Sequence, residues 1–315
     1  MSIESDLKKD GITVIEPLDT TTVNVIAKNV SEKIVTAFSN LGFDFDTLYE
    51  RFSKLPMYIA NMPEGMSEAS YFYKNSAVYF RDGMGLADLE KFAVHELIHN
   101  FQEQKDEKGN LTRLGLCTFK GSKTTGMALN EAAVQLLASN ILENTFETAT
   151  YYDITFSTVS PNCYPLLCNL IYQMAYVTGD EVLFESTFNS NDHFKNKFVA
   201  LCGENTYNQV SNYFDKILET EEKIIKISNK IQNTDLSISR AKSLYKKSDE
   251  LKKQLKNAYF SAQELIISTY FSNLSKDLIT SVDIDRFRKK LYSFQDLIGT
   301  TSSYSFLHRN DGKSW

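Results

Sequence analysis

The chain has 315 residues, of which 42% are hydrophobic and 23% are charged, and its formal net charge at pH 7 is −6. This is the composition of a globular protein that is long enough to bury a core without disulfides or structural metals. The acidic balance argues against a general electrostatic grip on nucleic acid or on an anionic membrane, so we expect neither as a partner.

The N-terminus and the cysteines predict a cytoplasmic protein. The first ten residues are charged and lack the apolar core of a secretory signal, and no run approaches the roughly twenty apolar residues that span a bilayer. None of the cysteines forms a CxxC pair, and we expect reduced and mostly buried thiols. The four cysteines are Cys117, Cys163, Cys168 and Cys202.

Hydrophobic spacing in the first part of the chain predicts helices next to a small sheet. Two short aromatic and β-branched runs, 71–73 and 77–80, flank a polar turn and predict a β-hairpin or two strands of a sheet. The other elements expected here are an irregular or extended segment over 1–20, helices over 23–38 and 45–52, and a strand over 55–60.

The middle of the chain alternates between helical patterns and short extended runs. A glycine at position 179 is expected to end the last of these helices. The elements expected are a helix over 86–103, a strand over 111–119, a loop over 121–125, and helices over 127–142 and 164–177.

The last hundred residues are predicted to form one long helix or a helical hairpin, with its break at 233–235. Apolar residues recur here every seven positions, at Ile217, Ile224, Ile231, Ile238 and Tyr245. The second core position of each heptad lacks a consistent large apolar residue, so packing on the same chain is favoured over a dimeric coiled coil. We therefore predict a first domain over 1–213 and a helical extension over 214–315, whose residues after Gly299 are polar and loose.

The residues with the clearest chemistry are His95-Glu96-Leu97-Ile98-His99, an HExxH sequence within a predicted helix. Residues four apart lie on one helical face, so both imidazoles can bind one Zn²⁺ ion. Glu96 is rotated away from that face and can act as general base on a metal-activated water. Only four histidines are present, and two of them fall in this one turn.

A third ligand is needed, because catalytic zinc usually takes three protein side chains. The extended HExxHxxGxxH pattern is absent, since Gln102 and Lys105 stand where its Gly and His would be. Glu131 is the candidate that we favour, because it lies in an apolar helix where a carboxylate is costly to bury unless it is paired or bound to metal. An exposed helical glutamate is the alternative.

The combination of HExxH with Asn130-Glu131 on a later helix resembles the gluzincin branch of the zincin metallopeptidases, to which thermolysin belongs. The small cytosolic zincins of the ImmA/IrrE type are similar as well. The resemblance implies that His95, His99 and Glu131 bind zinc and that Glu96 is the catalytic base. Gln135 stands in place of the family's aspartate, which orients a ligand histidine. The resemblance does not reach the C-terminal hundred residues.

Gluzincins also use a downstream Tyr or His to stabilise the oxyanion of the reaction. The candidates here are Tyr151, Tyr152, Tyr164 and His193, and we select Tyr164 because it opens a helix after Ser160-Pro161-Asn162. The strand 77–80 is expected either to be the sheet edge that pairs with an extended peptide substrate or to be an ordinary internal strand.

We therefore expect an α+β, zincin-like fold, with a small twisted sheet that is mostly antiparallel or mixed, an active-site helix under it, and a mainly helical C-terminal half. The predicted function is a zinc-dependent metallopeptidase, more typical of an endopeptidase, that cuts peptide or protein substrates. The C-terminal helices are expected to restrict access or to bind a protein partner. The alternatives are a catalytically weak zincin-like binding or regulatory protein, and a helical adaptor in which HExxH occurs by chance.

Overall fold

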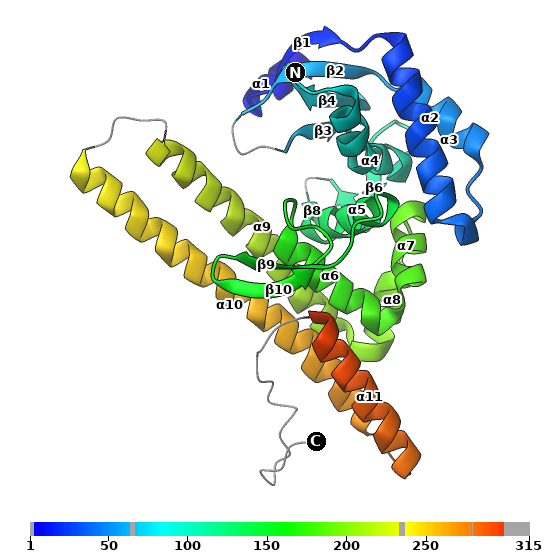
Figure 1. Ribbon diagram of the computed structural model, residues 1–315, viewed down its shortest axis with the longest axis vertical. Helices are drawn as coiled ribbons and strands as arrows, with labels where there is room; N and C mark the ends of the chain where they lie inside the picture. Colours follow the sequence, from blue (N-terminus) through cyan, green and yellow to red (C-terminus); the bar gives the residue numbers. More distant parts are fainter. Residues whose placement is uncertain are drawn as a thin grey trace.

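The computed structural model combines helices with small sheets (Figure 1). It describes residues 3–63, 67–121, 123–232, 237–276, 278 and 280–298. One sheet has four strands of mixed direction, a second has four antiparallel strands, and two further strands pair as a hairpin. The α+β class and the mainly helical C-terminal half predicted from the sequence are confirmed.

The mixed sheet is built from the N-terminal part of the chain (Figure 1). Its strands in spatial order are β1 (Thr13–Pro17), β2 (Met57–Asn61), β4 (Ala77–Arg81) and β3 (Ala69–Phe72). β2 and β4 are parallel, and the other neighbours are antiparallel. The predicted hairpin is present as β3 and β4. The alternative that made strand 77–80 the sheet edge is wrong, because β4 is paired on both sides and β3 is the edge.

The helices predicted near the N-terminus are present. Asp19 and Asp44 each accept a hydrogen bond from a backbone N–H of the first helical turn, which stabilises the start of both helices. Residues 3–9 form a helix, whereas an irregular or extended segment was expected; Leu7 is buried there, and Lys8 pairs with Glu4 one turn away. The elements of this region are α1 (Ile3–Lys9), α2 (Thr20–Ala37), the 3-10 turn η1 (Ser39–Leu41) and α3 (Phe45–Ser53).

The antiparallel sheet connects two central helices, α4 (Leu86–Gln102) and α5 (Met127–Ile141). The single strand predicted over 111–119 is wrong, because the chain reverses at Gly115, which has a φ of 56°. A Cβ atom there would lie 2.1 Å from the Asn130 side-chain oxygen, so only glycine fits this turn. Residues 123–125, predicted as loop, form a strand as well. The strands are β5 (Glu103–Lys105), β6 (Leu111–Leu114), β7 (Cys117–Lys120) and β8 (Lys123–Thr125).

A two-stranded hairpin and three helices that follow it complete the middle of the chain. The sequence patterns identified only α6 of these elements, and it ends at Gly179 as predicted. The elements are β9 (Glu147–Tyr151), β10 (Ile154–Thr158), α6 (Pro165–Thr178), α7 (Asp180–Asn189) and α8 (His193–Cys202).

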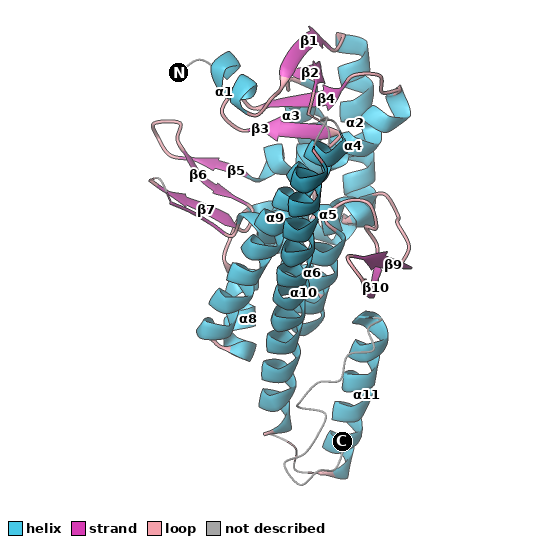
Figure 2. Ribbon diagram, turned by 90° about the vertical axis from the view of Figure 1, so that its left-hand side faces the viewer, coloured by secondary structure: helices cyan, strands magenta, loops and turns pink. Residues whose placement is uncertain are grey.

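The C-terminal region is a hairpin of two long helices, α9 (Glu204–Gln232) and α10 (Ile238–Ser275), that run side by side in Figures 1 and 2. The predicted break at 233–235, the tail after Gly299 and His308 lie outside the described residues. α11 (Ser281–Ile298) packs against α6 and α10. Residues 213 and 214 both lie inside α9, and the division into 1–213 and 214–315 stays a prediction.

The hairpin packs on the same chain, as expected. Ile217 and Ile224 of α9 and Leu255 of α10 are buried in one apolar core with residues of α5 and α6. The seven-residue repeat does not continue into α10, however, because Ile238 is 77% exposed and Tyr245 is 56% exposed. Further along α10, from Leu251 on, the buried residues follow one another mostly at three- and four-residue steps.

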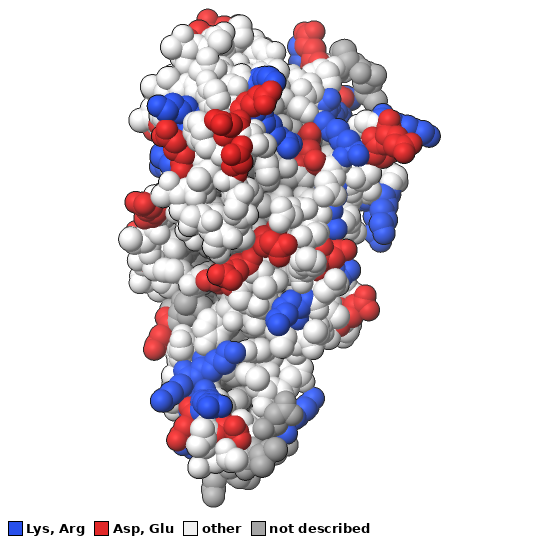
Figure 3. Space-filling view, turned by 90° about the vertical axis from the view of Figure 1, so that its right-hand side faces the viewer, with Lys and Arg blue, Asp and Glu red and all other residues white. Residues whose placement is uncertain are grey.

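The surface is mixed in charge on the side where α2, α3 and α7 lie (Figure 3). Acidic and basic side chains are interspersed over the described residues drawn there, and they do not gather into one basic patch on that face. Within the described part of the chain, every helix is too short or too polar to cross a membrane.

Candidate metal centre

Helix α4 presents both HExxH histidines on one face. Its other faces are fixed in the core by apolar residues such as Ala93 and Leu97, which are fully buried. The Nε2 atoms of His95 and His99 lie 3.0 Å apart, and His99 is 5% exposed. The spacing of four residues therefore brings two imidazole nitrogens to one point, as predicted.

Helix α5 packs against α4 and brings the predicted third side chain to the same point. The Glu131 carboxylate lies 3.3 Å from Nε2 of His95 and 3.4 Å from Nε2 of His99. One ligand atom from each of the three residues lies within 4.8 Å of the others. The alternative of an exposed glutamate is wrong, because the Glu131 side chain is 17% exposed.

The charges of the cluster fit a cation between the three side chains. Burial raises the pKa of Glu131, but the neighbouring imidazoles of His99 and His95 outweigh it and hold the pKa below its ordinary value. Burial lowers the pKa of His95, and Glu131 and Glu96 more than reverse this, to about 9. Two nitrogens and a carboxylate are also the donor set of many catalytic zinc sites, so the three residues can hold a metal ion.

Asn130, the first residue of the Asn-Glu pair, fixes α5 in register with α4. Its side chain accepts a hydrogen bond from the backbone N–H of Leu116 at 2.9 Å and donates one to Gln102 at 3.2 Å. Because Gln102 ends α4, these bonds tie both helices to the turn at Gly115. These bonds therefore fix the position of Glu131 along the axis of α4, opposite the two histidines.

Gln135 orients the first histidine. It lies one turn after Glu131, and its side-chain oxygen is 2.9 Å from Nδ1 of His95. The same side chain donates a hydrogen bond to Ser160, which in turn donates to the backbone carbonyl of Cys163. This chain of bonds directs Nε2 of His95 at Glu131. By contrast, Nδ1 of His99 is buried and has no hydrogen-bond partner among the described residues.

Glu96 lies beside the cluster and contacts the edge of the mixed sheet. It is 7% exposed, and its Oε2 atom accepts a hydrogen bond of 2.6 Å from the backbone N–H of Tyr71 in β3. Burial raises the pKa of Glu96, and the charges of His95 and His99 only partly oppose this. A carboxyl with a raised pKa is suited to take up a proton near neutral pH.

Tyr164 is the oxyanion candidate that lies next to the histidines. Its ring centroid is 6.3 Å from that of His95, and its backbone has a φ of 48°, an uncommon conformation for a residue with a side chain. Burial, followed by the charge of Glu131, raises the pKa of its hydroxyl well above the ordinary value. Tyr164 therefore keeps its proton and can donate it in a hydrogen bond.

The other oxyanion candidates have different partners. Tyr151 donates a hydrogen bond to Glu221, and the hydroxyl of Tyr152 lies 3.4 Å from that of Tyr151. His193 begins α8 and bonds Glu185 at 3.2 Å, with a side chain that is 65% exposed.

Cys117, Cys168 and Cys202 are buried, Cys163 is half-buried, and all four thiols are free.

Sequence patterns missed three residues at or near the centre. Tyr71 contributes its backbone N–H, which carries no side-chain signal, and Ser160 acts through Gln135. Glu221 is one charged residue among many on α9. Compared with protein-family models, curated proteins and solved structures, the chain matches none. The chemistry of the centre is therefore inferred from its own residues.

Proposed function

We propose that the protein is a zinc-dependent metallopeptidase with a zincin-like catalytic region. The observation that carries the proposal is the convergence of His95, His99 and Glu131 within 4.8 Å, with Glu96 buried next to them. His95, His99 and Glu131 would hold the ion. Zinc supplies Lewis acidity, which acidifies water and polarises a carbonyl oxygen.

The chain's own residues supply the proton transfers and the oxyanion contact. Glu96 takes the proton of the attacking water and passes it to the leaving amine, a role that its raised pKa favours. Tyr164 donates a hydrogen bond to the oxygen that gains negative charge. The edge strand β3, in place of the internal β4, is positioned to pair with an extended peptide, because Tyr71 directs its N–H toward Glu96.

Metal binding tests the three ligands. Purified protein is loaded with zinc, and its metal content is measured by mass spectrometry for the wild type, His95→Ala and Glu131→Ala. We expect one zinc per wild-type chain. In each variant the affinity for zinc should fall by more than the roughly 10- to 100-fold that is lost when a residue hydrogen-bonded to a ligand is removed. His193→Ala is the matched control, because His193 is exposed and bonds Glu185 instead. Stoichiometric zinc in both ligand variants would sink the assignment.

Cleavage of a peptide library, read by mass spectrometry, tests the activity. Wild-type protein is expected to cut internal peptide bonds, and Glu96→Gln is expected to lose cleavage while keeping zinc, since Glu96 is not a ligand. Zinc binding without cleavage by the wild type would instead favour the binding or regulatory alternative.

A further inference from the structure

Helix α9 carries a second buried carboxylate, which the roles above do not use. Among the described acidic residues, Glu96 and Glu221 are the most buried, at 7% and 8% exposed. Tyr151 donates a hydrogen bond to Glu221, but no Lys, Arg or His of the described part lies within ion-pair distance of it. Burial raises its pKa, with Tyr151 only partly opposing this. Burying a carboxylate without a cation costs folding free energy. A positively charged group of a bound ligand would offset this cost.

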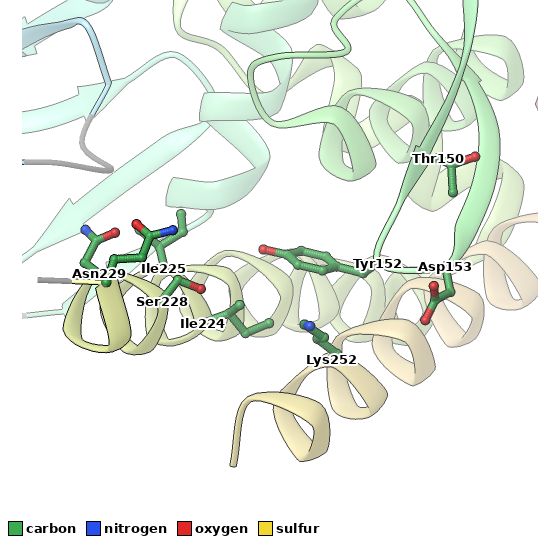
Figure 4. Close-up of a pocket in the computed structure, with 9 residues that line it drawn as sticks. Thr150, Tyr152, Asp153, Ile224, Ile225, Ser228, Asn229 and Lys252 are labelled. Carbon is green, nitrogen blue, oxygen red and sulfur yellow. The ribbon is translucent and has the colours of Figure 1, made fainter. Parts of the chain in front are cut away.

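A cavity of about 520 Å³ lies between the β9–β10 turn and the α9–α10 hairpin (Figure 4). Its lining on α9 begins one helical turn after Glu221, which is not itself part of the lining. Tyr152 extends over α9 as one wall, and its hydroxyl lies next to Tyr151, the residue that bonds Glu221. Ile224 and Ile225 follow Glu221 by one helical turn and lie on the same face of α9. The cavity is lined by Thr150, Tyr152, Asp153, Ile224, Ile225, Ser228, Asn229, Gln232 and Lys252.

Glu221 is also close enough to the metal centre to act on its residues electrostatically. Burial and then the charges of Glu131, Glu96 and Glu221 raise the pKa of the Cys163 thiol to about 12. Glu221 acts in the same direction on Tyr164, whose ring lies beside His95. Along α9, Glu221 follows Asp215, which accepts a hydrogen bond from the backbone N–H of Ala128 at the start of α5, and it precedes the cavity residues, which begin at Ile224.

We propose that this cavity receives the part of a peptide substrate next to the bond that is cut, and that Glu221 selects a Lys or Arg side chain there. The proposal rests on the proposed peptidase function and names its substrate class. Ser228 contributes a hydroxyl to the lining, and a hydroxyl can donate to or accept from a peptide backbone. Among the described residues that line the cavity, the one cation is Lys252, which is 42% exposed and lies 3.8 Å from Asp249, so it forms no ion pair with Glu221.

The test compares two peptides that differ by a single ammonium group, one with lysine and one with norleucine, at each position near the cleaved bond. In the zinc-loaded wild type we expect kcat/KM to favour lysine by at least about tenfold at one position, the gain typical of a charged hydrogen bond. Glu221→Gln still accepts the Tyr151 hydrogen bond but has no charge, so the preference should fall to within about twofold. A wild type without preference, or a preference that survives in Glu221→Gln, would overturn the proposal.

Two further variants separate charge recognition from folding. Glu222→Gln is the matched control, since Glu222 is 57% exposed on the same helix, and it should keep the preference. Ser228→Lys places a cation in the cavity wall at a half-buried helical position, and it should reduce the preference for lysine even where Glu221→Gln folds poorly.

A binding measurement distinguishes failure of this proposal from failure of the peptidase function. Fluorescein-labelled lysine and norleucine peptides are titrated with Glu96→Gln and with Glu96→Gln/Glu221→Gln, and anisotropy is read. Tighter binding of the lysine peptide that is lost in the double variant supports the cavity assignment even if the wild type cuts neither peptide. Equal binding of both peptides by Glu96→Gln overturns it, whether or not the wild type is a peptidase.

Discussion

Two regions of the molecule bury carboxylates, and they give them opposite neighbours. On α4 and α5, Glu96 and Glu131 lie next to the imidazoles of His95 and His99. These imidazoles act to lower the pKa of both carboxyls, and together with Glu131 they could hold a metal ion. On α9, Glu221 has a tyrosine hydroxyl and, among the described residues, no cation as an ion-pair partner. The first group could hold a metal ion with its own side chains, whereas the second, by our proposal, takes its cation from a substrate. The comparison teaches that the partner of a buried charge, more than the burial itself, indicates what the charge is for.

The largest difference between the two carboxylate regions is expected in the rate of cleavage, when the charge of Glu96 is removed. Glu96→Gln should lower kcat by about 10²- to 10⁴-fold, the usual contribution of a general base, and should leave zinc content unchanged. The rate is measured on any peptide that the wild type cuts, with metal content determined in parallel. A variant that has lost its zinc would show that Glu96 supports the ligand cluster instead of moving a proton.

Tyr164 is expected to give the next largest effect. Tyr164→Phe keeps the ring beside His95 and removes only the hydroxyl, so kcat should fall by about 10²- to 10³-fold, as for an oxyanion donor. KM should change much less, because the hydrogen bond forms with the charge that develops during the reaction. Tyr172→Phe is the comparison variant, since Tyr172 lies on α6 and its ring packs against that of Phe146. A fall of the same size in both variants would count against a specific role for Tyr164.

Gln135 tests how the metal centre is held. Gln135→Ala removes the hydrogen bond to Nδ1 of His95 and breaks the connection to Ser160. We expect zinc affinity to fall by about 10- to 100-fold, which competition with a chelator measures. Ser160→Ala leaves the bond between Gln135 and His95 in place and should have the smaller effect. Equal losses in both variants would mean that the loop after β10, and not the histidine contact, sets the affinity.

The sequence could identify the α4–α5 region because its information is local. HExxH determines which side chains share one helical face, and the apolar neighbours of Glu131 show that it is buried. The α9 region offered no such pattern, because Tyr151, Tyr152 and Glu221 meet only through tertiary packing. The same reason explains the missed turn at Gly115, whose conformation is imposed by Asn130 and Gln102 from other elements. Local spacing predicted the helices well, and contacts between distant segments decided the rest.

The smallest expected effect is on stability, and its sign follows from the environment of Glu221. Burial raises the pKa of this carboxyl, so the folded state binds its proton more tightly than the unfolded state does. The wild type therefore loses stability as the pH rises from below the ordinary pKa of a glutamate to above the raised one, and Glu221→Gln does not. We expect the two proteins to have equal free energies of unfolding near about pH 4, and the variant to become the more stable of the two as the pH rises above the raised pKa.

Urea unfolding of both proteins at a series of pH values measures this difference. Glu222→Gln provides the baseline, since Glu222 is 57% exposed and pairs with Lys226. A gain that is independent of pH would mean that the glutamine improves packing. A loss at high pH would mean that a cation in the protein already compensates Glu221, and the contrast between the two carboxylate regions would then disappear.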